Sequence, residues 1–282
     1  MNIFSVNYHL IKTCNMKCKG CYAKYEKLNS NLSLKSHLVI LSKIVEYANK
    51  NNILKRKINF VGGEPTLLKE LPILIAFMSK AGFITSIVTN GSLISEKYIN
   101  KFKVKPNWIG ISIDSFDKIT NWQLGRVTNK GLVIDYQEKA RIIIKNNIKL
   151  KINTMINKLN YQEDMNKKIS NIHPDRWKLF QFLKIDGENE NSVNLLGIND
   201  KKFKFFIKNH SNLTNKIKII HENNNDMRGS YLMISPEGSL FDNTSGKLKY
   251  SKSLLEVSFS DALSEIKYSE KKLKLRGGNY EW

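Results

Sequence analysis

Cys14-Asn15-Met16-Lys17-Cys18-Lys19-Gly20-Cys21-Tyr22 is the stretch that decides the fold, because it holds all three cysteines of a chain of 282 residues. The C-x3-C-x2-C spacing puts three thiolates on one short loop. Three thiolates can hold three corners of a cubane iron-sulfur cluster, whereas such clusters are normally held by four cysteines. The fourth iron is therefore left open to a different ligand.

A structural zinc site is the alternative interpretation of this loop. Zinc in closed sites takes four ligands, and here the fourth would be one of five scattered histidines or a carboxylate. An odd number of cysteines that stay as thiolates also suits a reducing compartment. We therefore favour a [4Fe-4S] cluster over zinc.

Composition indicates a globular protein with an anionic partner. Hydrophobic residues make up 41% and charged residues 25% of the chain, and its length suits one barrel domain. No apolar run is long enough to span a membrane and no signal peptide is visible, so we expect a cytoplasmic protein without a membrane partner. The net charge of +21 favours nucleic acid, an anionic membrane or a phosphorylated substrate.

Apolar periodicity predicts strands that alternate with helices. The predicted strands are 3–12, 57–61, 83–89, 108–113, 150–156 and 177–183, and the predicted helices are 34–47, 67–80, 95–102, 135–146 and 163–171. This order argues for parallel βα units, either in an open doubly wound sheet or in a partial barrel. The motifs follow strand ends, where barrels place their chemistry, so we expect an α/β fold of the partial (β/α)6 TIM-like type.

The regular alternation ends near residue 184. We therefore expect residues 1–183 to form the barrel and residues 184–282 to form a C-terminal extension packed on it. The extension's predicted elements are a helix at 201–208, strands at 231–234 and 239–241 that pair across 236–238, and an amphipathic segment at 261–268. We expect the basic tail after residue 271 to become ordered over the substrate.

A glycine-rich motif ends the second predicted strand. Gly62-Gly63-Glu64-Pro65 combines two glycines, which let the backbone approach a ligand closely, with a proline that stops the strand. About forty residues after the cysteine loop, this motif resembles the one by which radical S-adenosylmethionine (SAM) enzymes hold the SAM amino group. The cysteine loop with its following aromatic Tyr22 resembles their cluster loop, where SAM chelates the open iron and yields a 5'-deoxyadenosyl radical.

Cationic residues stand on several predicted strands. Arg176 and Lys178 flank Trp177, and residues two apart on a strand face the same way. Inside a barrel this pair needs an anion, and a triphosphate supplies one through charge-assisted bonds of roughly 1.5 to 3 kcal/mol each. Lys57 and Lys151 are single lysines in a basic chain, for which a solvated surface position is the ordinary interpretation.

Segments along essentially the whole chain are similar to those of the viperin family, antiviral radical SAM enzymes of animals with prokaryotic relatives. The matching segments are 7–10, 14–21, 57–60, 62–65, 90–94, 114–117, 125–126, 151–153, 160–165, 176–178, 187–189, 230–232 and 276–278. The resemblance implies abstraction of the ribose C4' hydrogen of a nucleoside triphosphate and loss of its 3'-hydroxyl, with CTP favoured over UTP and GTP. The resemblance implies that the 3'-deoxy-3',4'-didehydro product terminates the nucleic acid chains that viral (phage) polymerases synthesise.

The resemblance also implies a role for each matching residue. The cluster would be bound by Cys14, Cys18 and Cys21. SAM would be held by Tyr22, Gly62, Gly63, Glu64, Asn90, Ser112 and Arg126. The substrate would be held by Asn7, Lys57, Lys151, Asn153, Arg176, Lys178, Arg276, Gly277 and Gly278, and Tyr231 would finish the radical step. An external electron donor of flavodoxin or ferredoxin type is implied, without a stable nucleic-acid complex.

Two positions depart from the family pattern. Val61 stands where animal relatives have a serine, which removes a hydroxyl from the substrate side, and Thr89 replaces the serine before Asn90. The N-terminal amphipathic helix that anchors animal relatives to membranes is absent, as expected for a soluble enzyme.

Two other functions fit part of the sequence. A different radical SAM enzyme, acting on RNA or a peptide, would keep the cysteine loop and Gly62 to Pro65 but would not need the cations. Peptide-modifying relatives commonly carry extra cysteines for auxiliary clusters, which this chain lacks. A nucleic-acid-binding protein without enzymatic activity would explain the net positive charge. It would not need the three-cysteine loop and Gly62 to Pro65 at the ends of successive strands.

Overall fold

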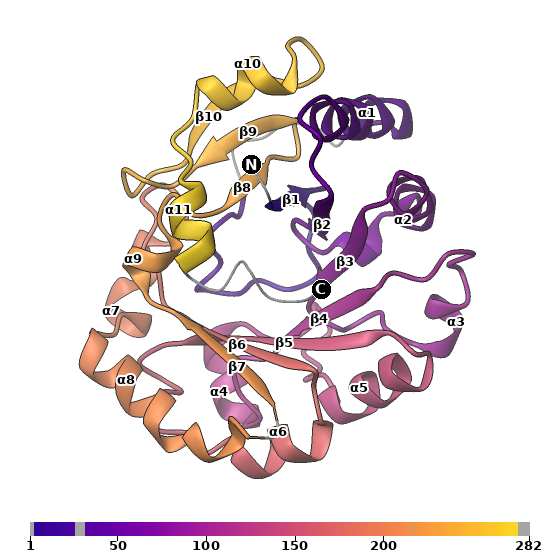
Figure 1. The fold of residues 1–282 in the computed structure, drawn as a ribbon. Helices are drawn as coiled ribbons and strands as arrows, with labels where there is room; N and C mark the ends of the chain where they lie inside the picture. The colour runs from indigo at the N-terminus through magenta and orange to yellow at the C-terminus, as the bar shows by residue number, and fades with distance from the viewer. Residues whose placement is uncertain (1–2, 26–31, 216, 276–282) are drawn as a thin grey trace.

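One sheet organises the protein, whose computed structural model describes residues 3–25, 32–215 and 217–275. In the described chain its ten strands have the order β10-β9-β8-β1-β2-β3-β4-β5-β6-β7 (Figure 1). They are β1 Ile3–His9, β2 Lys55–Val61, β3 Ile84–Thr89, β4 Trp108–Ser112, β5 Lys149–Ile156, β6 Arg176–Gln181, β7 Lys218–Glu222, β8 Leu232–Ile234, β9 Ser239–Asp242 and β10 Lys249–Ser253.

Helices cover the outside of this sheet (Figure 1). They are α1 Leu34–Lys50, α2 Leu71–Lys80, α3 Glu96–Ile99, α4 Lys118–Leu124, α5 Tyr136–Lys145, α6 Asn166–Ile172, α7 Val193–Leu196, α8 Asp200–Asn209, α9 Asn224–Met227, α10 Phe259–Ser264 and α11 Glu270–Leu273. Short 3-10 turns are η1 Pro65–Leu67, η2 Glu190–Ser192 and η3 Ser211–Leu213. Among the described residues, no helix combines the length and apolar character needed to cross a membrane.

The strand order confirms the partial barrel. Strands β1 to β6 pair in parallel and in sequence, whereas a doubly wound sheet reverses its order midway. The described sheet stays open, because β10 and β7 lie at its two ends.

The region after residue 183 supplies strands at both edges of this sheet. β7 adds in parallel to β6, and β8 adds in parallel to β1. The predicted hairpin is confirmed, since β8 and β9 pair antiparallel through Met233 with Phe241 and Ile234 with Leu240. The division of the chain at residues 183 and 184 stays a prediction.

The two faces of the sheet differ sharply in polarity. On β5, Leu150 and Ile152 belong to the apolar core that the outer helices cover, and Lys151 and Asn153 alternate with them. A Cβ added to Gly110 of β4 would lie 2.7 Å from the Lys151 Cε, so these side chains cross the inner face. The interior of this barrel is therefore polar, which makes it suitable for binding a polar ligand.

Candidate active site

The three cysteines lie on the loop between β1 and α1. Its backbone turns where the Cys21 N–H donates to the Cys18 carbonyl at 3.2 Å, and the Met16 N–H donates to the Cys14 sulfur at 3.4 Å. Burial raises the pKa of all three thiols, that of Cys21 to about 12, and the nearby Cys18 further raises the pKa of Cys14 and Cys21. They are thus close together, and only a bound metal would keep them as thiolates near neutral pH.

This donor set fits a cluster better than a single ion. Among the described residues, no group of three or more His, Cys, Asp and Glu side chains converges closely enough to hold one metal ion. A cubane distributes its cysteine ligands over separate irons, so three thiols spread along one loop suit it. The zinc alternative gains no support in the described part of the chain.

The Gly-Gly-Glu-Pro motif supports the cysteine loop directly. The Gly63 N–H donates to the Ile11 carbonyl at 2.6 Å, and the Glu64 N–H donates to the Thr13 carbonyl at 2.8 Å. A Cβ on Gly63 would lie 2.2 Å from the Thr13 oxygen. The close approach that the glycines permit is therefore seen with the cysteine loop, whereas we predicted an approach to a ligand.

The other side of the loop rests on α4 and on residues after β6. Gly125, in the left-handed region with φ 72°, packs so closely that its Cβ would lie 2.2 Å from the Lys17 carbonyl oxygen. The Asn189 amide donates to the Gly20 carbonyl at 3.3 Å, and the Ser192 hydroxyl donates to the Lys19 carbonyl at 2.7 Å. Contacts from the region after residue 183 thus help to fix the positions of the cysteines.

Glu64 connects the ends of β2 and β3 beside the cysteines. Its side chain is buried, and its Oε1 accepts hydrogen bonds from the N–H and hydroxyl of Thr66 and, at 2.5 Å, from the Thr89 hydroxyl. Its Oε2 accepts the Asn90 N–H at 2.7 Å. Because each carboxylate oxygen has two lone pairs, Oε2 can accept a further donor such as an amine. Thr89 supplies the hydroxyl that the family pattern places here.

Asn90, at the end of β3, and Arg126, just after α4, lie near the cysteines. The Asn90 Nδ2 lies 2.8 Å from the Asn15 Oδ1 and 4.0 Å from the Cys14 sulfur. Arg126 is paired with the buried Asp114 through a 2.6 Å contact, and its positive charge lowers the pKa of the cysteines. Ser112 is the last residue of β4, and the assignment of these three residues to SAM stays a prediction.

Four predicted cations are brought together on the inner face. Lys151 pairs in register with Arg176, and Asn153 pairs with Lys178. Lys57, Lys151, Arg176 and Lys178 are all buried, with between 2% and 8% of their surface exposed. Burial, followed by the charges of Lys151, Arg176, Lys178 and Lys149, lowers the pKa of Lys57 well below its usual value. The positive charges of these side chains make the barrel interior suitable for binding an anion.

Trp108 lies among these cations, and the sequence alone did not identify it as a site residue. The Arg176 Cζ lies 4.8 Å, the Lys57 Nζ 5.1 Å and the Lys149 Nζ 5.3 Å from its ring centroid. The same face carries buried polar atoms without a hydrogen-bond partner among the described residues, namely the Ser86 hydroxyl, the Trp108 N–H and the Asn153 Oδ1. Such atoms fit a ligand or water inside the barrel.

Glu222, also missed, joins two predicted residues. Its buried carboxylate forms an ion pair with Lys178 at 2.5 Å and accepts a hydrogen bond from the Tyr231 hydroxyl. The Lys178 Nζ also lies 3.2 Å from the Tyr231 oxygen. The signal was weak because β7 reads Lys-Ile-Ile-His-Glu, which is too short and too polar to predict a strand.

The remaining predicted residues lie in three places. Asn7 of β1 accepts a hydrogen bond from Asn59 at 2.9 Å on the inner face. The Tyr22 hydroxyl lies 3.3 Å from the His9 Nε2, and burial lowers the pKa of His9 to about 3, so the imidazole is neutral. The predicted contacts at 276–278 lie outside the described residues.

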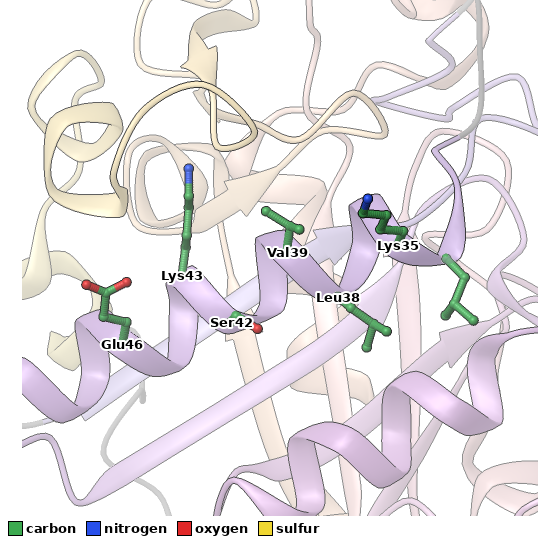
Figure 2. A pocket seen from close by; sticks show the side chains of 7 residues that line it. Lys35, Leu38, Val39, Ser42, Lys43 and Glu46 are labelled. Carbon is green, nitrogen blue, oxygen red and sulfur yellow. The ribbon is translucent and has the colours of Figure 1, made fainter.

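A surface pocket lies elsewhere, along α1 (Figure 2). It is lined by Leu34, Lys35, Leu38, Val39, Ser42, Lys43 and Glu46. None of the predicted site residues lines it.

Comparison with known proteins agrees with this geometry. Residues 8–167 match the Radical SAM superfamily. Over 99% of its length the chain is 38% identical to an S-adenosylmethionine-dependent nucleotide dehydratase of Flammeovirga pacifica, of which it covers 96%. It is 36% identical over 99% of its length to the S-adenosylmethionine-dependent nucleotide dehydratase RSAD2 of Siniperca chuatsi, of which it covers 79%.

A solved structure shares the fold at low identity. Streptococcus suis SuiB bound to S-adenosylmethionine superposes with a TM-score of 0.67 at 16% identity, covering 98% of this chain and 68% of that one. Radical SAM enzymes use a [4Fe-4S] cluster and SAM, which fits the three-cysteine loop and the residues around it. The chain belongs to the radical SAM superfamily and, within it, to the viperin family of SAM-dependent nucleotide dehydratases.

Proposed function

We propose that this protein converts a ribonucleoside triphosphate, preferentially CTP, to its 3'-deoxy-3',4'-didehydro form. The observation that carries the proposal is the set of four buried cations inside the barrel, Lys57, Lys151, Arg176 and Lys178. Four positive side chains converge here, with the Glu222 carboxylate beside Lys178, and so dense a positive charge attracts a polyanion such as a triphosphate. A peptide substrate supplies no triphosphate for these cations, so they favour a nucleotide over the peptide alternative.

The level of each residue along the strands supports one orientation of the substrate. Glu64 and Asn90 follow the carboxyl ends of β2 and β3, whereas Lys151 and Arg176 lie near strand beginnings. The phosphates would therefore extend into the barrel while the ribose stays near the cysteine loop. Asn7 and Asn153, between the two levels, would hydrogen-bond the ribose.

The chemistry begins at the ribose C4' carbon. With the cluster held by Cys14, Cys18 and Cys21, SAM would supply the radical chemistry that removes the C4' hydrogen. Loss of the 3'-hydroxyl as water then consumes one proton, and one electron completes the C3'=C4' double bond. The barrel must therefore deliver one electron and one proton to a site closed to water.

Tyr231 is the residue we assign to this delivery. Its phenol gives up one electron and one proton together, and the neutral tyrosyl radical that remains is restored by one electron and one proton from an external donor of flavodoxin or ferredoxin type. Glu222 and Lys178 hold the phenol oxygen in place, and the Glu222 carboxylate can relay its proton to the departing hydroxyl. The product lacks a 3'-hydroxyl, so it would terminate nucleic acid synthesis in antiviral defence.

Incubation of the reduced, reconstituted enzyme with SAM and each of the four ribonucleoside triphosphates tests the reaction. Mass spectrometry should show a product lighter by one water, with CTP as the preferred substrate. Substrate deuterated at C4' should transfer its label to 5'-deoxyadenosine. Label that arrives from another ribose carbon would contradict the mechanism, and turnover of a peptide or RNA with none of the nucleotides would contradict the substrate class.

The lowered pKa of Lys57 predicts a pH dependence. Burial and like charges favour the neutral amine, whereas a bound triphosphate favours the ammonium, so binding should take up a proton below the usual pKa of lysine, 10.5. Affinity for inorganic tripolyphosphate should then fall as pH rises above the lowered pKa of Lys57, because the free protein no longer carries the proton that the complex needs. Calorimetry in buffers of different ionisation enthalpy measures this uptake.

Lys57→Arg provides the matched control, because a guanidinium stays charged at these pH values. Its proton uptake should be lower than that of the unchanged protein by up to one proton. Equal uptake in both proteins would show that another group takes the proton.

A further inference from the structure

Trp108 occupies the deepest level of the cationic interior. It is the first residue of β4, and its register partners are Ser86 and Lys149, whereas Ser112 at the other end of β4 lies near the SAM residues. Its side chain is 3% exposed. A nucleotide whose ribose lies near the cysteine loop would direct its terminal phosphate towards this level.

The indole ring attracts cations without neutralising them. Arg176 and Lys57 lie 4.8 Å and 5.1 Å from its centroid, within the distance at which an aromatic face attracts a cation. A carboxylate at this place would form ion pairs and compete with a phosphate for the same cations. An aromatic ring positions these two cations without adding a negative charge of its own.

Trp108 also carries a donor of its own. Its N–H is buried and has no hydrogen-bond partner among the described residues. Indole nitrogen only donates, so the natural partner is an acceptor such as a phosphate oxygen. Gly110, two residues further along β4, leaves room for the Lys151 side chain, since a Cβ there would lie 2.7 Å from its Cε. On β4, Trp108 thus supplies an aromatic ring, and Gly110 leaves space for the Lys151 side chain.

We propose that Trp108 is a specificity-determining residue that selects triphosphates over diphosphates. It holds Lys57 and Arg176 at the level towards which the terminal phosphate of the proposed substrate would point. The inference rests on the proposed function, because it assumes that the cations bind the phosphates of the substrate. The opposing interpretation is that Trp108 only fills the end of the barrel.

Binding of inorganic tripolyphosphate and pyrophosphate to the reconstituted protein separates the two interpretations. Calorimetry should show that Trp108→Leu weakens tripolyphosphate binding roughly tenfold and changes pyrophosphate binding less than about twofold. Trp108→Phe keeps an aromatic face and should retain most of the affinity. Trp122→Leu removes an exposed tryptophan of α4 and should bind both anions as the unchanged protein does.

Tryptophan fluorescence gives a readout that does not depend on the leucine variant. Tripolyphosphate should change the emission of the unchanged protein and of Trp122→Leu, but not that of Trp108→Phe. An equal loss of affinity for both anions in Trp108→Leu, or no loss for either, would overturn the assignment. Failure of the unchanged protein to bind tripolyphosphate would overturn the triphosphate site itself, a result distinct from the other two.

Discussion

Replacing Cys18 by alanine should abolish 5'-deoxyadenosine formation and leave the barrel folded. The described loop offers three thiols to the cluster, and loss of one leaves too few ligands to assemble it. The barrel core lies on the other face of the sheet and contains no cysteine. Visible absorption after anaerobic reconstitution measures the loss of the cluster. Chromatography of the SAM products measures the loss of 5'-deoxyadenosine formation.

Lys19→Ala is the matched control for this variant. Lys19 is exposed, and its hydrogen bonds to Leu124 and Ser192 are made by its backbone N–H and carbonyl, which alanine keeps. It should bind the cluster and cleave SAM at close to the normal rate. SAM cleavage that persists in Cys18→Ala would defeat the assignment of the cluster ligands.

Tyr231→Phe should slow nucleotide product formation about a hundredfold or more while SAM cleavage continues. Removing the hydroxyl removes the group that we assign to deliver the electron and proton, and proton transfer by a positioned side chain is typically worth about 10²- to 10⁴-fold. Glu222→Gln should produce the same uncoupling in weaker form, because the amide cannot relay a proton as the carboxylate does. The ratio of dehydrated nucleotide to 5'-deoxyadenosine, read by mass, checks both variants.

The Glu222 variant should also be less stable. Breaking a buried ion pair from one side costs roughly 3 to 5 kcal/mol, because the Lys178 charge then lacks its partner. Thermal unfolding separates this cost from the change in product ratio. Tyr250→Phe on β10 serves as the control and should keep the normal ratio. A full rate of product formation in Tyr231→Phe would remove Tyr231 from the mechanism.

The sequence predicted the barrel because its outer face is apolar. Residues such as Ile58, Ile109 and Ile152 pack under helices, so their spacing reveals strands β2, β4 and β5 within one or two residues of their bounds. The cysteine loop and Gly62 to Pro65 were found because their residue types leave few alternatives. Strand alternation identified Arg176 and Lys178, the family resemblance added Lys57 and Lys151, and the structure shows that the four share one interior.

The residues that sequence reasoning missed share a physical reason. Glu222 lies on an edge strand whose inner face is polar, so the usual alternation of apolar residues is weak there. Trp108 looks like an ordinary core residue at the start of a strand, and its role depends on cations from β2, β5 and β6. Contacts between strands far apart in sequence do not affect the local spacing of apolar residues, so that spacing cannot predict them.

The place of β1 in the sheet has a consequence for biosynthesis. β1 pairs with β2 on one side and with β8 on the other, where Val6 lies opposite Leu232. The cysteine loop is synthesised directly after β1, yet β8, the second neighbour of β1, follows the loop by roughly 210 residues. Since such distant pairings form late and domains fold as units, the loop acquires its complete support only after β8 has been synthesised. Iron and sulfide are therefore expected to reach a finished site only after that point.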